Sequence, residues 1–280
     1  GGSNSLVIYS FLELELDKMR YNMSYIIADK LVKKFGKGDA AVAAVADISF
    51  RIEEGDFVGI MGESGAGKST LLGIMGAMNA PTSGKLIVDD IDIYSLGQEQ
   101  RADFRREFLG FIFQSFHLVP YLTVMENVML PLAVVKTTKK KKHQMAEEAL
   151  EQVGLLEKAR RLPNQISGGE KERVAIARSI VNEPPVLLAD EPTGNLDTKT
   201  TREIMELLLR FNQEGMTIVM VTHSPACANY AQRILRVTDG RLEEEDSKIR
   251  SIERWERNER KRESLLSQDQ KLVAASFPAG

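Results

Sequence analysis

The fold is decided by residues 57–70, which read FVGIMGESGAGKST. The five apolar or small residues 57–61 predict a buried strand, and a helical pattern begins near Lys68. Between them lies G-x-x-x-x-G-K-[ST], in the strand–loop–helix context that this motif requires. Its glycines let backbone N–H groups converge on phosphate oxygens, and the helix N-terminus adds partial positive charge. The stretch therefore predicts a phosphate-binding loop in an α/β core.

This loop predicts a binding site for a nucleoside triphosphate and a divalent cation. We expect Lys68 to reach the β- and γ-phosphates and the Ser69 hydroxyl to bind Mg²⁺. The loop residues expected to bind ATP are Gly62, Glu63, Ser64, Gly65, Ala66, Gly67, Lys68, Ser69 and Thr70.

A second strand is expected to deliver two carboxylates to the same place. Residues 186–191 read VLLADE, an apolar run that is typical of a parallel strand, and ligands bind beyond the carboxyl ends of such strands. We expect Asp190 to hold the metal through water and Glu191 to be the general base for the attacking water. An apolar strand that ends in Asp is a weak signal alone, but with the phosphate loop it predicts a P-loop ATPase.

Residues 166–170, ISGGE, come directly before a predicted helix and allow two interpretations. Ser167 can be an ordinary N-cap with two glycines that begin a helix flexibly. Alternatively, its hydroxyl and the exposed N–H groups form a second phosphate site. One chain does not need two γ-phosphate sites for one nucleotide, whereas two chains arranged head to tail do.

The segment resembles the signature of the ABC (ATP-binding cassette) ATPase family, LSGGQ, with Ile166 in place of Leu and Glu170 in place of Gln. The resemblance covers roughly residues 25–244. It implies that the signature acts on the nucleotide held by a second copy. The residues in question are Ser167, Gly168, Gly169 and Glu170.

Other family motifs follow in the expected order. Phe35 matches the aromatic residue that stacks on adenine, where Tyr is more usual. Gln114 matches the Q-loop glutamine, which implies roles in catalysis and metal binding, and Asp197 matches the D-loop. His223 matches the switch histidine, although Ser224 follows it where the family usually has Asp. A core phenylalanine, a surface amide and a loop histidine remain the structural alternatives for three of these positions.

Residues 113–120, 122–128 and 193–197 resemble one branch of this family, the macrolide-exporter, lipoprotein-releasing and cell-division ATPases. The resemblance implies an ATPase that uses ATP and Mg²⁺ and forms a homodimer on ATP binding. It also implies a separate integral membrane subunit of permease type as partner. The chain would then lie at the cytoplasmic face of the inner membrane, as a peripheral subunit.

Composition is compatible with this expectation. The 280 residues carry a formal net charge of −3, which argues against a general nucleic-acid binder. Cys227 is the only cysteine, so no internal disulfide can form. No stretch has the length of a transmembrane helix, so action at a membrane needs a partner. A soluble ABC ATPase with a non-membrane partner is the alternative, although residues 68–190 lack the sustained heptads of DNA-repair members.

Alternating strands and helices predict a parallel, doubly wound sheet. The expected fold is an α/β P-loop NTPase (RecA-like) core with an antiparallel β subdomain and an inserted helical subdomain. We expect a tag or upstream extension at 1–22 with the natural start at Met19 or Met23, an ATPase domain at 23–246, a helical lobe at about 95–180 and a charged tail at 247–280.

Hydrophobic patterns predict the elements within this domain. Strands are expected at 25–35, 48–52, 57–61, 85–93, 109–114, 186–189, 217–222 and 233–237, and helices at 168–181 and 199–213. A further helix is expected to follow the phosphate loop, with Leu71 and Met78 on its buried side, and to end at Pro81. Residues 139–142, four lysines, are expected to be a solvated loop or helix start, with contact to anionic lipid as the less favoured alternative. Residues 116–132 are either one wall of a partner groove or plain lobe core.

Overall fold

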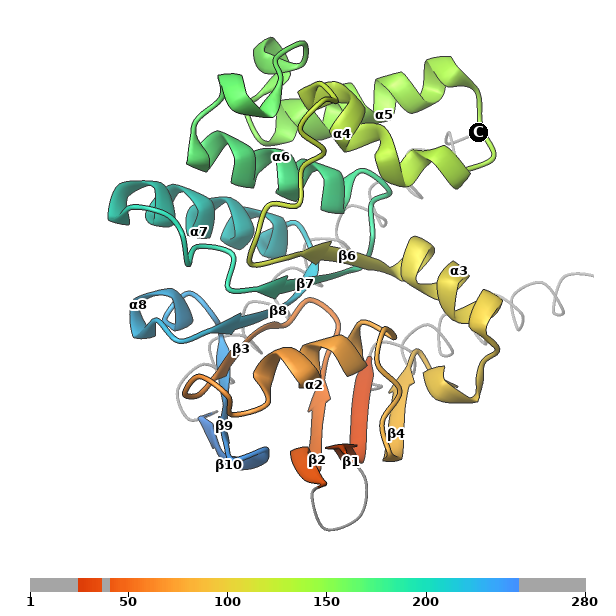
Figure 1. Ribbon diagram of the computed structural model, residues 1–280, viewed down its shortest axis with the longest axis vertical. Coiled ribbons are helices and arrows are strands. Elements are labelled where there is room, and N and C mark those ends of the chain that lie inside the picture. The colour runs from red at the N-terminus through yellow and green to blue at the C-terminus, as the bar shows by residue number, and fades with distance from the viewer. Residues whose placement is uncertain (1–24, 37–40, 247–280) are drawn as a thin grey trace, which may run out of the picture.

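The computed structural model describes residues 25–36 and 41–246 (Figure 1). The expectations for an extension at 1–22, for a natural start at Met19 or Met23, and for the tail 247–280 concern residues outside these ranges.

A six-stranded sheet with the order β10-β9-β3-β8-β7-β6 forms the core. Strands β9, β3, β8, β7 and β6 pair in parallel, and β10 pairs antiparallel with β9. The parallel order confirms the predicted doubly wound core. The strands are β3 (Phe57–Met61), β6 (Leu109–Ile112), β7 (Val186–Asp190), β8 (Thr217–Thr222), β9 (Arg233–Thr238) and β10 (Arg241–Asp246).

Successive side chains of these strands pack into two separate apolar clusters. In β7, Leu188 belongs to the cluster on one face of the sheet, and Leu187 and Ala189 belong to the cluster on the other. Neighbouring β8 alternates in the same way, because successive side chains of a strand point to opposite faces. The parallel sheet is therefore covered on both sides, which explains its continuous apolar sequence.

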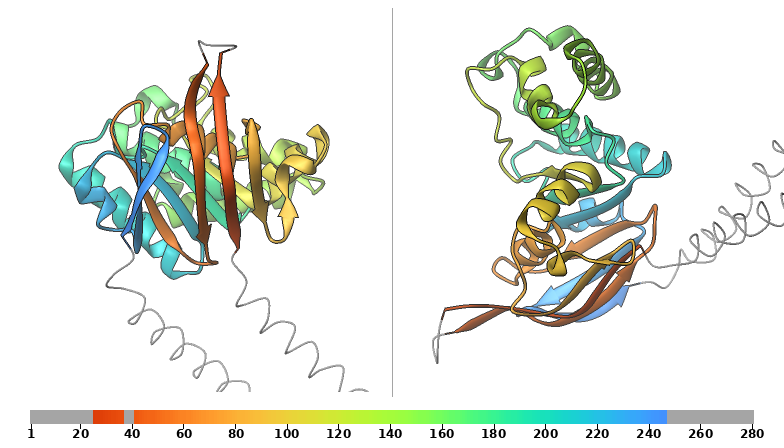
Figure 2. Two further views of the ribbon diagram at one scale, coloured as in Figure 1. Left: turned by 90° about the horizontal axis from the view of Figure 1, so that it is seen from below. Right: turned by 90° about the vertical axis from the view of Figure 1, so that its right-hand side faces the viewer.

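A second, antiparallel sheet has the order β2-β1-β4-β5 and confirms the expected β subdomain. The strands of the long β1–β2 hairpin project beyond the other described elements (Figure 2). Helix α2 packs against strands of both sheets, with Leu71 and Leu72 fully buried. The strands are β1 (Ile26–Phe35), β2 (Val42–Ile52), β4 (Ser83–Val88) and β5 (Ile91–Asp92).

Most of the other helices cover the opposite face of the core sheet or form the lobe above it (Figure 1). The α-helices are α2 (Lys68–Met75), α3 (Gln98–Phe108), α4 (Val124–Met129), α5 (Lys139–Gln152), α6 (Gly168–Ile180), α7 (Thr198–Gln213) and α8 (Pro225–Ala228). Among the described residues, no helix is long and apolar enough to cross a membrane. The lysines at 139–142 begin α5, one of the two alternatives expected for them.

Two sequence expectations were wrong in detail. The helix after the phosphate loop ends at Met75, because Ala77 takes a left-handed conformation with φ of 53°. Met78 is consequently 44% exposed, where a buried position was expected. The expected single strand 85–93 is a short hairpin, because Asp89 and Asp90 both have positive φ and turn the chain into β5.

Helix α6 contains a buried carboxyl group that the apolar pattern did not predict. Glu172 is 1% exposed, and its Oε1 atom has no hydrogen-bond partner among the described residues. Burial raises the pKa of Glu172 from its ordinary value of 4.5 to about 8, and the charge of Arg178 opposes this only partly. The folded chain therefore holds this proton up to a higher pH than the unfolded chain does.

Glu172→Gln should accordingly stabilise the protein, because an amide has no ionised form to bury. The parent chain should lose free energy of unfolding as the pH rises from 4.5 to 8, whereas the variant should not. The variant's free energy of unfolding should therefore exceed the parent's by roughly 1–3 kcal/mol at pH 8 and by little at pH 5. Urea unfolding at both pH values measures it. Glu148→Gln, a change at an exposed position of α5, is the control. An equal gain at both pH values, or a loss at pH 8, would contradict the prediction.

Candidate functional site

The loop between β3 and α2 has a backbone that only glycine permits at two positions. Gly65 and Gly67 have φ of 81° and 97°, in the left-handed region. A Cβ atom on Gly67 would lie 1.9 Å from the Ala44 carbonyl oxygen of β2. The second sheet therefore packs directly on this loop and fixes its path. The glycine pattern that predicted the loop corresponds to real constraints on the backbone.

The Lys68 side chain folds back and bonds to the start of the same loop. Its Nζ atom donates to the carbonyl oxygens of Gly62 and Glu63, at 2.9 and 2.7 Å, and the residue is only 7% exposed. An ammonium group has three donors. The two carbonyls hold the charge at the edge of the cleft and leave capacity for an anionic ligand.

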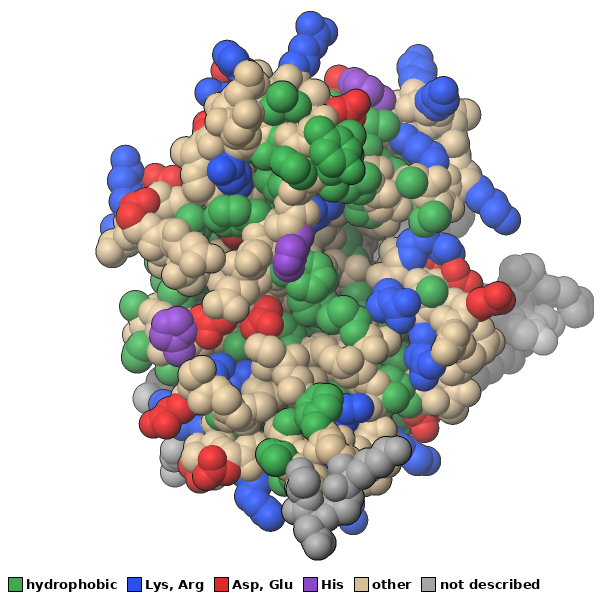
Figure 3. All heavy atoms as spheres, in the orientation of Figure 1, with side chains coloured by type: hydrophobic (Ala, Val, Ile, Leu, Met, Phe, Trp, Pro, Cys, Tyr) green, Lys and Arg blue, Asp and Glu red, His purple; other side chains and the backbone are tan. Residues whose placement is uncertain are grey.

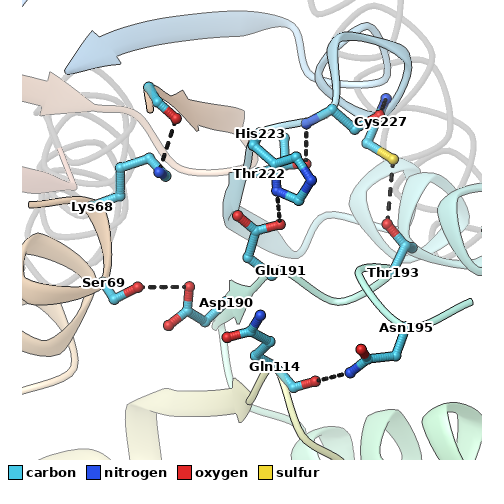
Figure 4. Close-up of polar contacts among 12 residues, drawn as sticks. Lys68, Ser69, Gln114, Asp190, Glu191, Thr193, Asn195, Thr222, His223 and Cys227 are labelled. Atoms are coloured by element: carbon cyan, nitrogen blue, oxygen red, sulfur yellow. Dashed lines mark hydrogen bonds and ion pairs between the residues drawn. The ribbon is translucent and has the colours of Figure 1, made fainter. Parts of the chain in front are cut away.

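Ser69 and Asp190 meet across the two motifs. The Ser69 hydroxyl donates to Oδ1 of Asp190 at 3.1 Å (Figure 4). Burial raises the pKa of Asp190 above its ordinary value, while the Ser69 hydrogen bond lowers it and the neighbouring Glu191 raises it. A hydroxyl and a carboxylate held together are the kind of oxygen ligands that Mg²⁺ prefers.

Glu191 and His223 form the second polar pair of the site. Oε2 of Glu191 lies 2.7 Å from Nδ1 of His223, with the carboxylate side chain 13% exposed and the imidazole 67% exposed (Figure 4). Glu191 has a φ of 51°, and its N–H donates to the Val221 carbonyl of β8. This left-handed turn at the end of β7 is uncommon for glutamate and aims the carboxylate away from the strand direction. The contact with His223 fixes the direction of the Glu191 carboxylate at the cleft.

Gln114 follows the edge strand β6 and joins this group. Its side chain lines the cleft, and its backbone oxygen accepts a hydrogen bond of 3.2 Å from the Asn195 side chain. Asn195 belongs to the segment that follows Glu191. The two loops beyond β6 and β7 are therefore tied together at the cleft wall.

These residues enclose an open cleft of about 540 Å³. It is lined by Ala44, Ser64, Gly65, Gly67, Lys68, Ser69, Thr70, Gln114, Glu191 and His223. Ala44 was not foreseen, because its position depends on how the antiparallel sheet packs on the loop. Gly62, Glu63 and Ala66 belong to the same loop but are not among the residues that line the cleft. Phe35 does not line this cleft; its ring is half exposed near the end of β1, with the Lys33 ammonium 5.3 Å away. Its stacking on adenine stays a prediction.

The predicted signature residues lie elsewhere on the chain. Among the described residues, none of 167–170 lines the cleft. Ser167 caps α6, with its Oγ atom accepting from the Glu170 N–H at 3.2 Å and the Glu170 carboxylate accepting from the Ser167 N–H at 2.8 Å. Ser167 and Gly168 are exposed. Both proposed interpretations of this segment are therefore compatible with the geometry, since a capped helix start also presents N–H groups to a ligand.

Charge at this helix start is partly balanced. Hydrogen bonding by the Ser167 backbone lowers the pKa of Glu170, and Lys158 lies 3.7 Å from its carboxylate. The departure from the usual glutamine therefore adds a negative charge that Lys158 offsets.

Asp197 caps the next helix, α7. Its carboxylate accepts from the Lys199 and Thr200 N–H groups and from the Thr200 hydroxyl, the last at 2.6 Å. These bonds lower the pKa of Asp197 and fix the Thr200 side chain. The Thr200 methyl group then lies 2.4 Å from where a Cβ atom on Gly169 would stand. The starts of α6 and α7 are thus packed tightly together.

Comparison with known proteins identifies the family to which this architecture corresponds. The family model described as "ABC transporter" matches residues 45–194. The lipoprotein-releasing system ATP-binding protein LolD of Geobacter metallireducens is 44% identical over 213 residues, which is 76% of this chain and 95% of that protein. The macrolide export ATP-binding/permease protein MacB of Syntrophobacter fumaroxidans is 41% identical over 230 residues, 81% of this chain and 32% of that protein.

Solved structures agree with these sequence matches. The dimeric post-hydrolysis state of the ATP-binding cassette MJ0796, bound to ADP and Pi, has a TM-score of 0.73 and 40% sequence identity. The match covers 79% of this chain and 97% of that one. The predicted fold class and the predicted family resemblance, including its branch, are confirmed.

Gly169→Ala should destabilise the protein through a clash within the chain. The Asp197 bond prevents Thr200 from rotating its methyl group away, so the new Cβ should cost about 1–2 kcal/mol and lower the melting temperature by roughly 2–8 °C. Adding Thr200→Ser removes the methyl group, keeps the hydroxyl and should restore most of the loss. Gly168→Ala, whose Cβ would meet no atom closer than 3.9 Å, is the control. Thermal unfolding measures these three variants beside the parent chain, and a double variant as unstable as Gly169→Ala would refute the clash.

Proposed function

This chain belongs to the ABC transporter family, and we propose that it is the ATP-hydrolysing subunit of a membrane complex, working as a head-to-tail pair of copies. The observation that carries the proposal is the separation of two phosphate-binding features on one chain. The cleft has a phosphate loop with its carboxylates, while the exposed helix start at Ser167 lies outside it. A second copy brings the two together.

ATP binds at the cleft through the phosphate loop. Lys68, anchored by two carbonyls, offers its remaining donor to the β- and γ-phosphates. The backbone N–H groups of 63–69 complete the cradle, as in other P-loops. In this proposal Phe35 stacks on the adenine.

The residues present fit a magnesium ion. Mg²⁺ is commonly held by one or two carboxylates together with substrate phosphates, and it favours oxygen ligands. The Ser69 hydroxyl, the Asp190 carboxylate and the Gln114 side-chain oxygen are such ligands at one side of the cleft. When bound, the ion neutralises charge on the β- and γ-phosphates.

Hydrolysis requires a proton acceptor beside the attacking water. Glu191 has that role in this proposal, because its carboxylate lies in the cleft with one oxygen held by His223. The histidine bond orients the carboxylate and leaves its other oxygen for water. In this proposal His223 orients the Glu191 carboxylate. Gln114 contributes its side chain to the same cleft.

The second copy contributes the signature. Ser167, Gly168, Gly169 and Glu170 present a hydroxyl and helix N–H groups to the γ-phosphate in the partner's cleft. Loss of that phosphate on hydrolysis removes the contacts that bridge the copies, so the pair reopens. Asp197, whose carboxylate is occupied by its own helix, holds the D-loop that lies between the two sites.

The helical lobe offers a surface for a permease subunit. Hydrophobic side chains gather on the lobe around α4 (Figure 3), where Tyr121 is 79% and Val134 65% exposed. Val124, Val128 and Leu132 of the same segment are fully buried, so residues 116–132 form both lobe core and exposed surface. We place the chain at the cytoplasmic face of the inner membrane, held there by this partner.

Glu191→Gln should slow turnover strongly while nucleotide binding remains. Removing the proton acceptor should lower the hydrolysis rate by about 10²–10⁴-fold, because the amide keeps the shape but cannot accept the proton. Phosphate release at saturating Mg-ATP measures turnover, and titration with a fluorescent ATP analogue measures binding.

Glu206→Gln, at an exposed position of α7 that pairs with Arg202, is the control and should keep full activity. Turnover of Glu191→Gln at the parental rate would show that another group is the base. Failure of the unsubstituted chain to hydrolyse ATP, alone and with a permease, would refute the proposed function itself.

A further inference from the structure

The segment that connects β6 to the helical lobe is held at two points. Its first point is the backbone oxygen of Gln114, which accepts from Asn195. Its second is a pair of adjacent carbonyl groups. Arg178 of α6 donates from Nη1 to the His117 oxygen and from Nη2 to the Phe116 oxygen, both at 2.7 Å. One guanidinium therefore clamps two successive peptide groups.

This clamp acts on an uncommon backbone conformation. His117 has a φ of 46°, in the left-handed region that non-glycine residues seldom occupy. Its ring meets the Phe113 ring edge-on, with centroids 5.2 Å apart. Such a conformation persists where surrounding contacts fix it. The two charge-assisted bonds from Arg178 are contacts of that kind.

Arg178 is bonded to carbonyls although a carboxyl group is near. Burial lowers the pKa of Arg178, and Glu172, six residues earlier on α6, opposes this shift when it is ionised. Among the described residues, however, no ion pair joins the two. Within residues 25–36 and 41–246, the guanidinium donates to the Phe116 and His117 carbonyls alone, and it is partly buried where the segment meets α6. Planar, two-pronged contact of this sort is specific to arginine.

Helix α6 connects the signature residues with the segment that Arg178 holds. Helix α6 begins at Gly168, directly after Ser167, and Arg178 is 11 residues beyond Ser167, a span of about 16 Å along the helix. The helix is a stiff element between the exposed signature and the segment that carries Gln114. A displacement of the helix start therefore moves the Phe116–His117 peptide groups as well.

We propose that Arg178 is a positioning residue for hydrolysis: it sets the Gln114 side chain in the cleft and links that side chain to movement of the signature helix. The proposal rests on the function proposed above. Arg178 touches no reacting atom, so its effect passes through Gln114. That route makes the two residues interdependent.

A double-mutant cycle with Arg178→Gln and Gln114→Ala tests this dependence. The rate of phosphate release, the apparent KM for ATP and the Mg²⁺ concentration for half-maximal activity are measured for each chain. Arg178→Gln should lower the rate roughly tenfold and raise the Mg²⁺ requirement, while Mg-free ATP binding stays within about twofold. In the Gln114→Ala background the same change should alter the rate less than about twofold. Arg178→Lys has a single ammonium group in place of the two-nitrogen fork, so its rate and Mg²⁺ requirement should lie between those of the parent chain and Arg178→Gln.

Arg173→Gln is the matched control. Arg173 lies on the same helix and bonds the Val153 carbonyl and Glu203, away from the segment 114–117. Its effect should be independent of Gln114→Ala. If Arg178→Gln does not fold, as thermal unfolding would show, Arg178→Lys takes its place in the cycle.

Multiplicative rate losses in the Arg178–Gln114 cycle would overturn the proposal, as would an unchanged Mg²⁺ requirement in Arg178→Gln. Either result leaves the proposed ATPase function intact, because the Glu191→Gln comparison tests that function separately.

Discussion

Parallel pairing of the core strands is the constraint on which the site depends. Because β3, β8, β7 and β6 run in one direction, the segments after their carboxyl ends meet at one edge of the sheet. Those segments carry the phosphate loop, His223, Asp190 with Glu191, and Gln114. Their contacts across strands, such as Ser69 with Asp190 and Glu191 with His223, exist only because the register brings these ends level. Apolar side chains on both faces hold that register in place.

Much of this could be predicted from the sequence because the signals are local. The loop 62–70 predicts its own conformation through its glycines, and the run 186–190 shows by its continuous apolar character that it is buried on both faces. Signals that depend on distant contacts were missed or misplaced. Ala44 lines the cleft only because the second sheet packs on Gly67. Met78 fits the helical period, yet the chain turns at Ala77 before reaching it.

The start of β2 illustrates the same limit. Residues 42–47 are rich in alanine and carry no clear alternation, so only the strand from 48 was expected, although pairing with β1 extends the strand back to Val42. Buried polar groups were also invisible to the pattern. Glu172 stands among other charged residues at 170–173, and such a run usually indicates a helix face exposed to solvent. The sequence gives no sign that Arg178 differs from any other basic residue, because its two carbonyl partners come from a distant segment.

Helix α6 unites these observations. At one end its capped start packs against Thr200 of α7 and faces solvent, and near the other end it clamps the segment after β6. One chain thus contains a cleft with its carboxylates and, apart from it, an exposed helix start suited to a phosphate. The account requires that a cleft from one copy and a helix start from another form each working site.

Mixing two inactive variants tests that requirement most directly. Lys68→Ala damages the phosphate loop and Ser167→Arg blocks the helix start, so each variant alone should lack ATPase activity. An equimolar mixture contains pairs with one intact site, built from the loop of one copy and the signature of the other. The mixture should recover roughly a quarter of the parental activity, if copies pair at random. No recovery from well-folded variants that pair with each other, or full activity in Ser167→Arg alone, would contradict the shared site.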